Sequence, residues 1–113
     1  MTAARLSALS VLAFGGPRTI GRLAAVEDVT GPTMTRIVDG LVDNGLARRT
    51  SHPDSARLVQ VEVTEVGREL MQAARQARIH EIVRALNGLS ATERAAIEAA
   101  APALRHLAQE ISS

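Results

Sequence analysis

The chain has 113 residues and a formal net charge of +1, and it is 46% hydrophobic but only 1% aromatic. This length and composition predict one domain with a helical extension, whose core consists of aliphatic side chains and alanine in closely packed helices. Because the sequence contains no cysteine, disulfides, thiolate catalysis and zinc–cysteine sites are excluded, and a cytoplasmic location is expected.

The N-terminal part of the sequence predicts two helices. Residues 2–13 form the first, and the Gly-Gly-Pro sequence at 15–17 ends it. Its leucines lie about one helical turn apart: Leu6, Leu9 and Leu12. Thr19 caps a second, shorter helix that runs to Val26. Phe14 is the only aromatic residue, and we expect it in the core.

A turn at 27–29 leads into a third helix. Thr30 is its N-cap, Pro32 lies in its first turn, where a missing N–H costs nothing, and Asn-Gly at 44–45 ends it. Its apolar residues share one face: Met34, Ile37, Val38, Leu41 and Val42. The outward face carries short residues, one long cation and one acid: Thr30, Gly31, Pro32, Thr33, Thr35, Arg36 and Asp39. The third helix is therefore predicted to be amphipathic.

After residue 45 the hydrophobic pattern changes from the helical period to the strand period. Residues 46–50 form a short strand, residues 51–55 have the composition of a turn, and residues 57–63 alternate strictly. Three valines of the second strand share one face: Val59, Val61 and Val63. The pattern predicts a β-hairpin directly behind the helix pair.

Two further helices are predicted after the hairpin. Thr64 caps a long helix that runs to about Asn87, and residues 90–93 form a capping box that opens the last helix. The apolar positions of the last helix are spaced 4-3-4-3: Ile97, Ala101, Leu104, Ala108 and Ile111. Such a seam packs against another helix, so a dimer interface is predicted. We assign four residues to it: Ile97, Ala101, Leu104 and Ile111. No segment is long enough to span a membrane.

The helix pair has the spacing of a helix-turn-helix. Ala24 is small enough to let the two helices cross closely, and Val29 fills the turn between them. The hydroxyls and Arg36 on the outward face suit a helix end that lies in the major groove of DNA. A solvated face between ordinary core helices is the other interpretation, and the helix pair alone leaves both open.

The hairpin favours DNA binding. Arg48, Arg49 and Arg57 flank a turn that contains a single acid, Asp54, although the net charge of the whole chain gives no such indication. A basic hairpin after the helix pair forms a wing, and Arg57 is the best placed residue to enter the adjacent minor groove. The alternative interpretation is that these arginines only keep an exposed strand edge soluble.

Together these stretches resemble the MarR family of bacterial regulators over residues 2–111. The resemblance rests on six stretches in this order: Thr19–Ala25, Pro32–Asp39, Leu41–Leu46, Arg49, Asp54–Arg57 and Val63–Leu70. It implies a winged helix-turn-helix dimer on a pseudo-palindromic operator, with the helix from Thr30 in the major groove and the 46–63 hairpin as the wing. The residues that it implies as DNA contacts are Thr33, Thr35, Arg36 and Arg57.

The sequence also departs from the family pattern. Asp28 occupies a turn position where glycine is usual, although aspartate tolerates the left-handed conformation better than most residues. Glu27 stands where an apolar residue is common and is expected to face solvent, and Ser55 stands where an acid usually pairs with the wing arginine. The chain begins at what resembles the second helix of the family. We therefore expect a truncated or naturally short member without the helix that normally completes the dimer interface.

No catalytic or metal site is predicted. Residues 51–54 include the types found in a catalytic triad, but neighbours in one turn cannot align a nucleophile, a base and an orienting acid. His52, His80 and His106 lack the spacing of metal ligands. No cofactor is expected, but the resemblance implies that a small aromatic anion binds as an effector between the DNA-binding part and the dimer helices.

The sequence thus predicts a mainly α protein with a small β-hairpin wing, divided into a winged helix-turn-helix (residues 1–63) and dimerisation helices (residues 64–113). We expect a homodimeric regulator, a repressor, that binds double-stranded DNA. A protein-interaction module whose winged helix no longer binds DNA is the alternative. The predicted DNA contacts are Thr30, Pro32, Thr33, Thr35 and Arg36 of the recognition helix, and Arg49, His52 and Arg57 of the wing.

Overall fold

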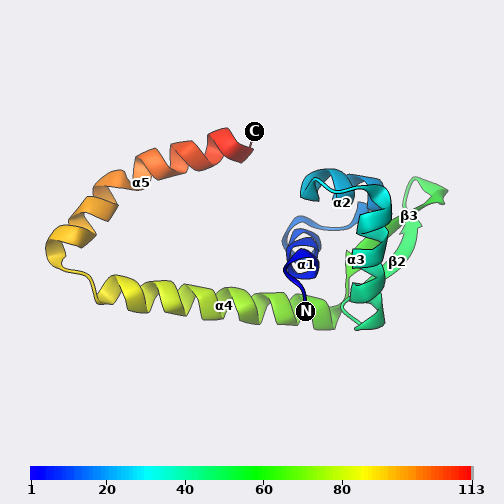
Figure 1. Ribbon diagram of the computed structural model, residues 1–113, viewed down its shortest axis with the longest axis horizontal. Helices are drawn as coiled ribbons and strands as arrows, with labels where there is room; N and C mark the ends of the chain where they lie inside the picture. Colours follow the sequence, from blue (N-terminus) through cyan, green and yellow to red (C-terminus); the bar gives the residue numbers. More distant parts are fainter. Residues whose placement is uncertain (113) are drawn as a thin grey trace. The chain divides into compact units, whose positions relative to one another are not determined.

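The computed structural model describes residues 1–112, which form five helices and one three-stranded antiparallel sheet (Figure 1). The elements in chain order are α1 (Ala3–Gly15), β1 (Arg18–Thr19), α2 (Ile20–Glu27), α3 (Gly31–Asp43), β2 (Ala47–His52), β3 (Ser55–Val63), α4 (Glu65–Asn87) and α5 (Ala91–Ser112). The predicted fold class, mainly α with a β-hairpin wing, is confirmed.

The chain divides into two compact units. The first comprises Met1–Arg75, and the second begins at Gln76, within α4. The first unit holds α1 to α3, the sheet and the start of α4, and the second holds the rest of α4 and α5. The functional boundary expected after residue 63 stays a prediction.

The core of the first unit is aliphatic, as the composition requires. Its largest fully buried side chains are Leu9, Leu12, Leu23, Met34, Val38, Leu41 and Val61. Two of its helices begin at the predicted N-caps. The hydroxyls of Thr19 and Thr30 accept hydrogen bonds from the backbone N–H groups of Arg22 and Thr33, both at 3.3 Å. Each cap satisfies a donor that the first helical turn leaves free, which is why the sequence locates both helix starts.

Phe14 does not lie in the core, so this prediction is wrong. The residue is 47% exposed, and the guanidinium carbon of Arg75 lies 5.1 Å from the centroid of its ring. The buried residues of α1 are Ala8, Leu9 and Leu12. Because Phe14 follows Leu12 by two positions, its side chain lies about 200° further round the helix, away from the buried face.

The sheet contains a strand that the sequence did not indicate. β1 pairs with β3, so that Arg18 lies opposite Val61 and Thr19 opposite Gln60, and the strand order is β1-β3-β2. Because this pairing stops at Gln60, Val59 is 48% exposed although Val61 is fully buried. The hairpin therefore has its base in the core, and its outer half projects beyond the third strand (Figure 1).

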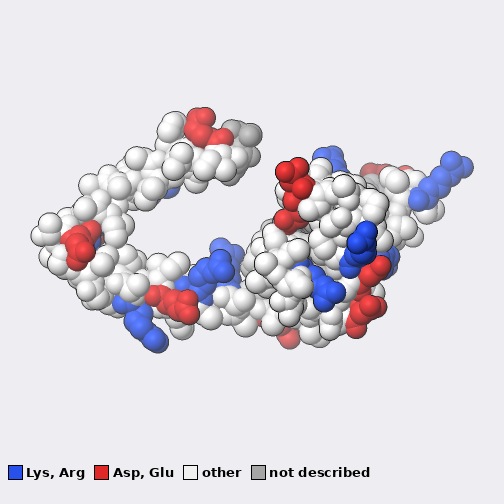
Figure 2. All heavy atoms as spheres, viewed as in Figure 1, with Lys and Arg blue, Asp and Glu red and all other residues white. Residues whose placement is uncertain are grey.

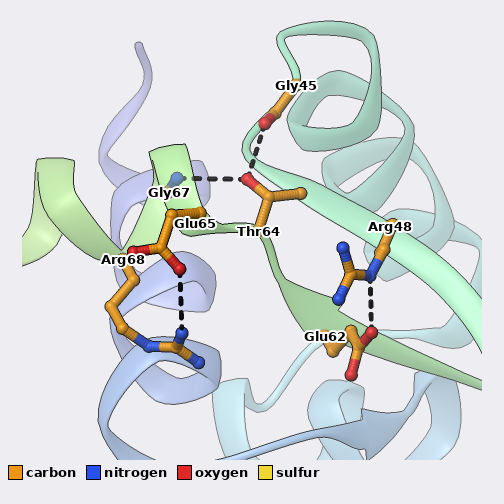
Figure 3. A network of polar contacts seen from close by, with 7 residues as sticks. All are labelled: Gly45, Arg48, Glu62, Thr64, Glu65, Gly67 and Arg68. Carbon is orange, nitrogen blue, oxygen red and sulfur yellow. Dashed lines mark hydrogen bonds and ion pairs between the residues drawn. The ribbon is translucent and has the colours of Figure 1, made fainter.

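β3 passes into α4 through a small network of polar contacts (Figure 3). The Thr64 hydroxyl donates to the backbone oxygen of Gly45 (2.7 Å) and accepts from the N–H of Gly67 (3.1 Å). The Thr64 N–H donates to the backbone oxygen of Leu46 (3.0 Å). A Cβ atom on Gly67 would lie 2.2 Å from that same oxygen. The first turn of α4 can approach the start of β2 this closely because residue 67 has no side chain.

In the second unit, the predicted capping box at the start of α5 is confirmed. The Ser90 N–H donates to the Glu93 carboxylate (3.0 Å), and the Glu93 N–H donates to the Ser90 hydroxyl (3.1 Å). The backbone hydrogen bond from Ser90, with a smaller contribution from its side chain, lowers the pKa of Glu93. None of the helices within residues 1–112 is both long enough and apolar enough to cross a membrane.

Candidate nucleic-acid interface

α2 and α3 are joined by the tight turn of a helix-turn-helix. Asp28 adopts the left-handed conformation (φ 54°, ψ 49°), and the Val29 N–H donates to the backbone oxygen of Ala24 (3.0 Å). Glu27 was expected to face solvent, but it is half-buried and its carboxylate accepts the hydroxyl of Ser7 at 2.8 Å. This contact links α1 to the end of α2. The turn is therefore fixed both by its own backbone hydrogen bond and by α1.

α3 exposes the face that was predicted to meet DNA. Its buried residues are Met34, Val38, Gly40 and Leu41. The predicted recognition residues are all exposed: Thr30, Pro32, Thr33, Thr35 and Arg36. The Thr35 hydroxyl donates to the backbone oxygen of Gly31, and the Thr30 hydroxyl donates to that of Thr33, both at 3.0 Å. Thr30 and Thr33 are thus joined at the exposed N-terminal turn of α3.

The register of the hairpin places Arg48 and Arg49 on two different faces. Arg49 lies opposite the buried Val61, whereas Arg48 lies opposite Glu62 and forms an ion pair with it. Residues directly opposite one another in an antiparallel pair share a face. Arg49 is therefore on the face that packs toward the helices, and Arg48 is on the other face. Arg57 lies farther out, between the pairs Ser51–Val59 and His52–Ser55, where the register of the hairpin shifts, so strand alternation does not assign its side chain to either face.

Arg49 and Arg57 have different partners. Arg49 forms an ion pair with Asp39 of α3, and the Arg57 backbone N–H donates to the hydroxyl of Ser55 (3.3 Å). Within residues 1–112, no ion pair involves the guanidinium of Arg57 or of Arg36, and both residues are exposed. Figure 2 shows basic side-chain atoms at the outer end of the hairpin. One arginine of α3 and one of the wing are thus available to an external anion.

His52, the remaining predicted wing residue, lies where β2 ends. Its Nδ1 atom accepts the backbone N–H of Asp54 (3.1 Å), so the neutral ring carries its proton on Nε2. His52 lines a depression of about 920 Å³ together with Arg18 and Arg22. No aspartate or glutamate is among the described residues that line it. The sequence did not point to Arg18 or Arg22, because they become neighbours of the hairpin through the pairing of β1 with β3.

The predicted interface residues of α5 lie on the surface of the single chain. Ile97, Leu104 and Ile111 are 43%, 56% and 76% exposed, and Ala101 is half-buried. Among the described side chains of α5, none is buried. A stripe of exposed large aliphatic side chains on one helix is typical of a surface that a partner covers.

Residues 1–58 match the family model described as the MarR family. An HTH-type transcriptional regulator of Mycobacterium tuberculosis, MT0903.1, is 42% identical to the chain over 106 residues, which cover 94% of this chain and 74% of that protein. The crystal structure of RV1404 from Mycobacterium tuberculosis has a TM-score of 0.84 at 28% identity, covering 94% of this chain and 73% of that one. Streptococcus pneumoniae FabT, solved in complex with DNA, shares the fold with a TM-score of 0.77 at 17% identity, covering 98% and 78% of the two chains. By these matches, the chain belongs to the MarR family of winged helix-turn-helix transcription regulators.

Proposed function

We propose that this chain is a homodimeric repressor that binds a pseudo-palindromic operator, with α3 in the major groove and the β2–β3 hairpin as the wing. The observation that carries the proposal is the exposure of Arg36 on α3 and of Arg57 in the outer part of the hairpin, neither of them ion-paired within the described residues. Arginines that are not neutralised by the protein are free to bind phosphates and base edges. The fold that the chain shares with FabT, which was solved with DNA, supports this role.

The dimer is proposed because large aliphatic side chains of the second unit are exposed in the single chain. The α5 stripe is accompanied by exposed large aliphatic side chains on α4: Ile79, Ile82 and Val83. A symmetric dimer built on these helices would bury them and place two recognition helices about one DNA turn (about 34 Å) apart. Operator symmetry would then mirror the symmetry of the protein.

A mobility-shift assay with the DNA upstream of its own gene tests the proposed function. We expect the chain to retain this DNA in the presence of excess unrelated duplex, with an affinity that falls as salt rises, because binding releases counterions from the phosphates. Binding that shows no preference for the upstream DNA, or no binding, would instead favour the alternative function, a protein-interaction module whose winged helix has lost its DNA contacts.

The substitution Arg36→Ala tests the recognition helix. If Arg36 contacts a phosphate, the variant should bind all sequences more weakly, and the slope of log affinity against log salt should decrease by about 1. If Arg36 reads a guanine, discrimination at one base pair should be lost, at a cost of about 1–3 kcal/mol. Titrations of operator variants at several salt concentrations measure both quantities, and an unchanged affinity would remove Arg36 from the interface.

The substitution Arg57→Ala tests the wing. An arginine in the minor groove responds to groove width, so the variant should lose affinity, by about 1–3 kcal/mol, chiefly for operators with A·T-rich flanks. Arg48→Ala is the matched control, since Arg48 is another exposed arginine of the hairpin but pairs with Glu62. We expect the control to keep the preference for A·T-rich flanks. An equal loss for Arg57→Ala on G·C-rich flanks would show that Arg57 contacts a phosphate instead.

The small aromatic anion expected as an effector stays a prediction. Within the first unit, the depression beside the hairpin combines cationic side chains with an apolar surface: Arg18, Arg22 and His52 with Val26, Leu58 and Val59. This depression is not the expected place between the DNA-binding part and the dimer helices, but its lining is compatible with an anion that has an apolar part, because the guanidinium groups donate charge-assisted hydrogen bonds to a carboxylate.

A further inference from the structure

α3 carries an acidic side chain on the face that is proposed to approach DNA. Asp39 is exposed and follows Arg36 by three positions, so the two side chains are neighbours on the helix surface. A carboxylate close to phosphates weakens DNA binding by repulsion between like charges. An acid at this position therefore needs a compensating role or a partner.

The partner is Arg49 of β2. Its guanidinium Nη2 contacts a carboxylate oxygen of Asp39, and the two side chains are 35% and 53% exposed. Arg49 reaches α3 because its position opposite Val61 directs it to the inner face of the hairpin. The contact joins the recognition helix directly to the wing, and it neutralises both charges.

This contact lies near the base of the hairpin, so a change in it alters the position of the tip. The third strand β1 pairs with β3 only at Val61 and Gln60, so the hairpin beyond Gln60 has no third strand to fix its direction. Arg57 lies four residues beyond Val61, which corresponds to at most about 13 Å, because the register of the hairpin shifts beyond Val59. A change of about 10° in the angle of the hairpin at its base would displace Arg57 by about 2 Å, enough to break a hydrogen bond.

We propose that the Asp39–Arg49 pair sets the angle between recognition helix and wing, and that Asp39 is a positioning residue for the wing contact of Arg57. The inference rests on the proposed DNA binding and refines it, because it assigns Arg49 to an ion pair within the protein instead of to a DNA contact. The competing assignment is that Arg49 binds phosphate directly and that its contact with Asp39 is incidental.

The substitution Asp39→Asn separates the two assignments by the sign of its effect. It keeps the shape of the side chain and removes one negative charge, so electrostatics alone, or a direct phosphate contact by Arg49, predicts tighter binding. A positioning role predicts the opposite: affinity for an operator with A·T-rich flanks falls by about 3- to 10-fold, and the preference for these flanks is reduced, as in Arg57→Ala. Tighter or unchanged binding of Asp39→Asn would overturn the proposal.

Two further variants make the result specific. Asp43→Asn removes the same charge from another exposed position of α3 and should not reduce the flank preference. The double variant Asp39→Asn/Arg57→Ala should bind no more weakly than Arg57→Ala alone, because the pair acts through Arg57. Fully additive losses in the double variant would contradict this coupling.

Thermal unfolding of the same proteins excludes a general loss of stability. An exposed ion pair contributes little to folding, so Asp39→Asn should melt within a few degrees of the unsubstituted chain. A chain that binds no operator overturns the proposed function and this inference together. A chain that binds its operator but is insensitive to Asp39→Asn overturns the inference alone.

Discussion

Replacement of Leu104 by glutamate is expected to convert the dimer to monomers and to weaken operator binding by about 10²- to 10⁴-fold. Leu104 is 56% exposed in the single chain and lies in the middle of the apolar stripe of α5. In a dimer, a carboxylate at this position would be buried among aliphatic side chains without a partner, which is strongly unfavourable. A monomer contacts one half-site at a time and loses the high effective concentration of the second recognition helix.

Sedimentation velocity and operator titration measure these two effects. Gln109→Glu is the matched control, because it adds the same charge to an exposed position of α5 outside the stripe. We expect this control to remain dimeric and to bind normally, and both variants to keep the far-ultraviolet circular dichroism of the unsubstituted chain. A monomeric unsubstituted chain at micromolar concentration, or normal operator binding by Leu104→Glu, would contradict the proposed dimer.

The second large effect concerns folding. Gly67→Ala is expected to lower the free energy of unfolding by about 1–3 kcal/mol, although alanine is the better helix former by about 0.5–1 kcal/mol. The new Cβ atom would lie 2.2 Å from the Leu46 backbone oxygen and 2.8 Å from a methyl carbon of Val63. The Leu46 oxygen cannot move freely, because it accepts the N–H of Thr64 at 3.0 Å. The junction of wing and α4 must therefore distort.

Thermal and urea unfolding measure this loss, which corresponds to several degrees in melting temperature for a chain of this size. Gly21→Ala is the control in the same unit, because a Cβ atom there meets nothing within 4 Å. This control should be as stable as the unsubstituted chain or more stable. If Gly67→Ala were equally stable, α4 would not pack on the start of β2 as closely as described.

Features that depend on neighbours in sequence could be predicted without the structure. The caps at Thr19, Thr30 and Ser90 use a side chain and a backbone group three residues apart, so the local sequence specifies them. The exposed face of α3 follows from the helical period for the same reason. The left-handed turn at Asp28 was also predictable, since aspartate is one of the few non-glycine residues that adopt this conformation readily.

Features that depend on distant pairing could not be predicted. β1 is only two residues long, and its partner lies about forty residues later in β3, so no local pattern marks it as a strand. The pair of Asp39 with Arg49 joins two different elements, and the sequence gives Asp39 only as a member of the outward face. The exposure of Phe14 was missed because hydrophobicity alone does not tell on which side of α1 a residue lies.

The central claim, that two copies of α3 enter successive major grooves of one operator, is tested most directly by a methylation-protection footprint of guanine N7 on the bound duplex. N7 lies in the major groove, so a recognition helix that occupies the groove protects it. We predict two protected tracts with centres about 10–10.5 base pairs apart, related by the symmetry of the operator. Retarded DNA without protected guanines, or with a single protected tract, would contradict the account.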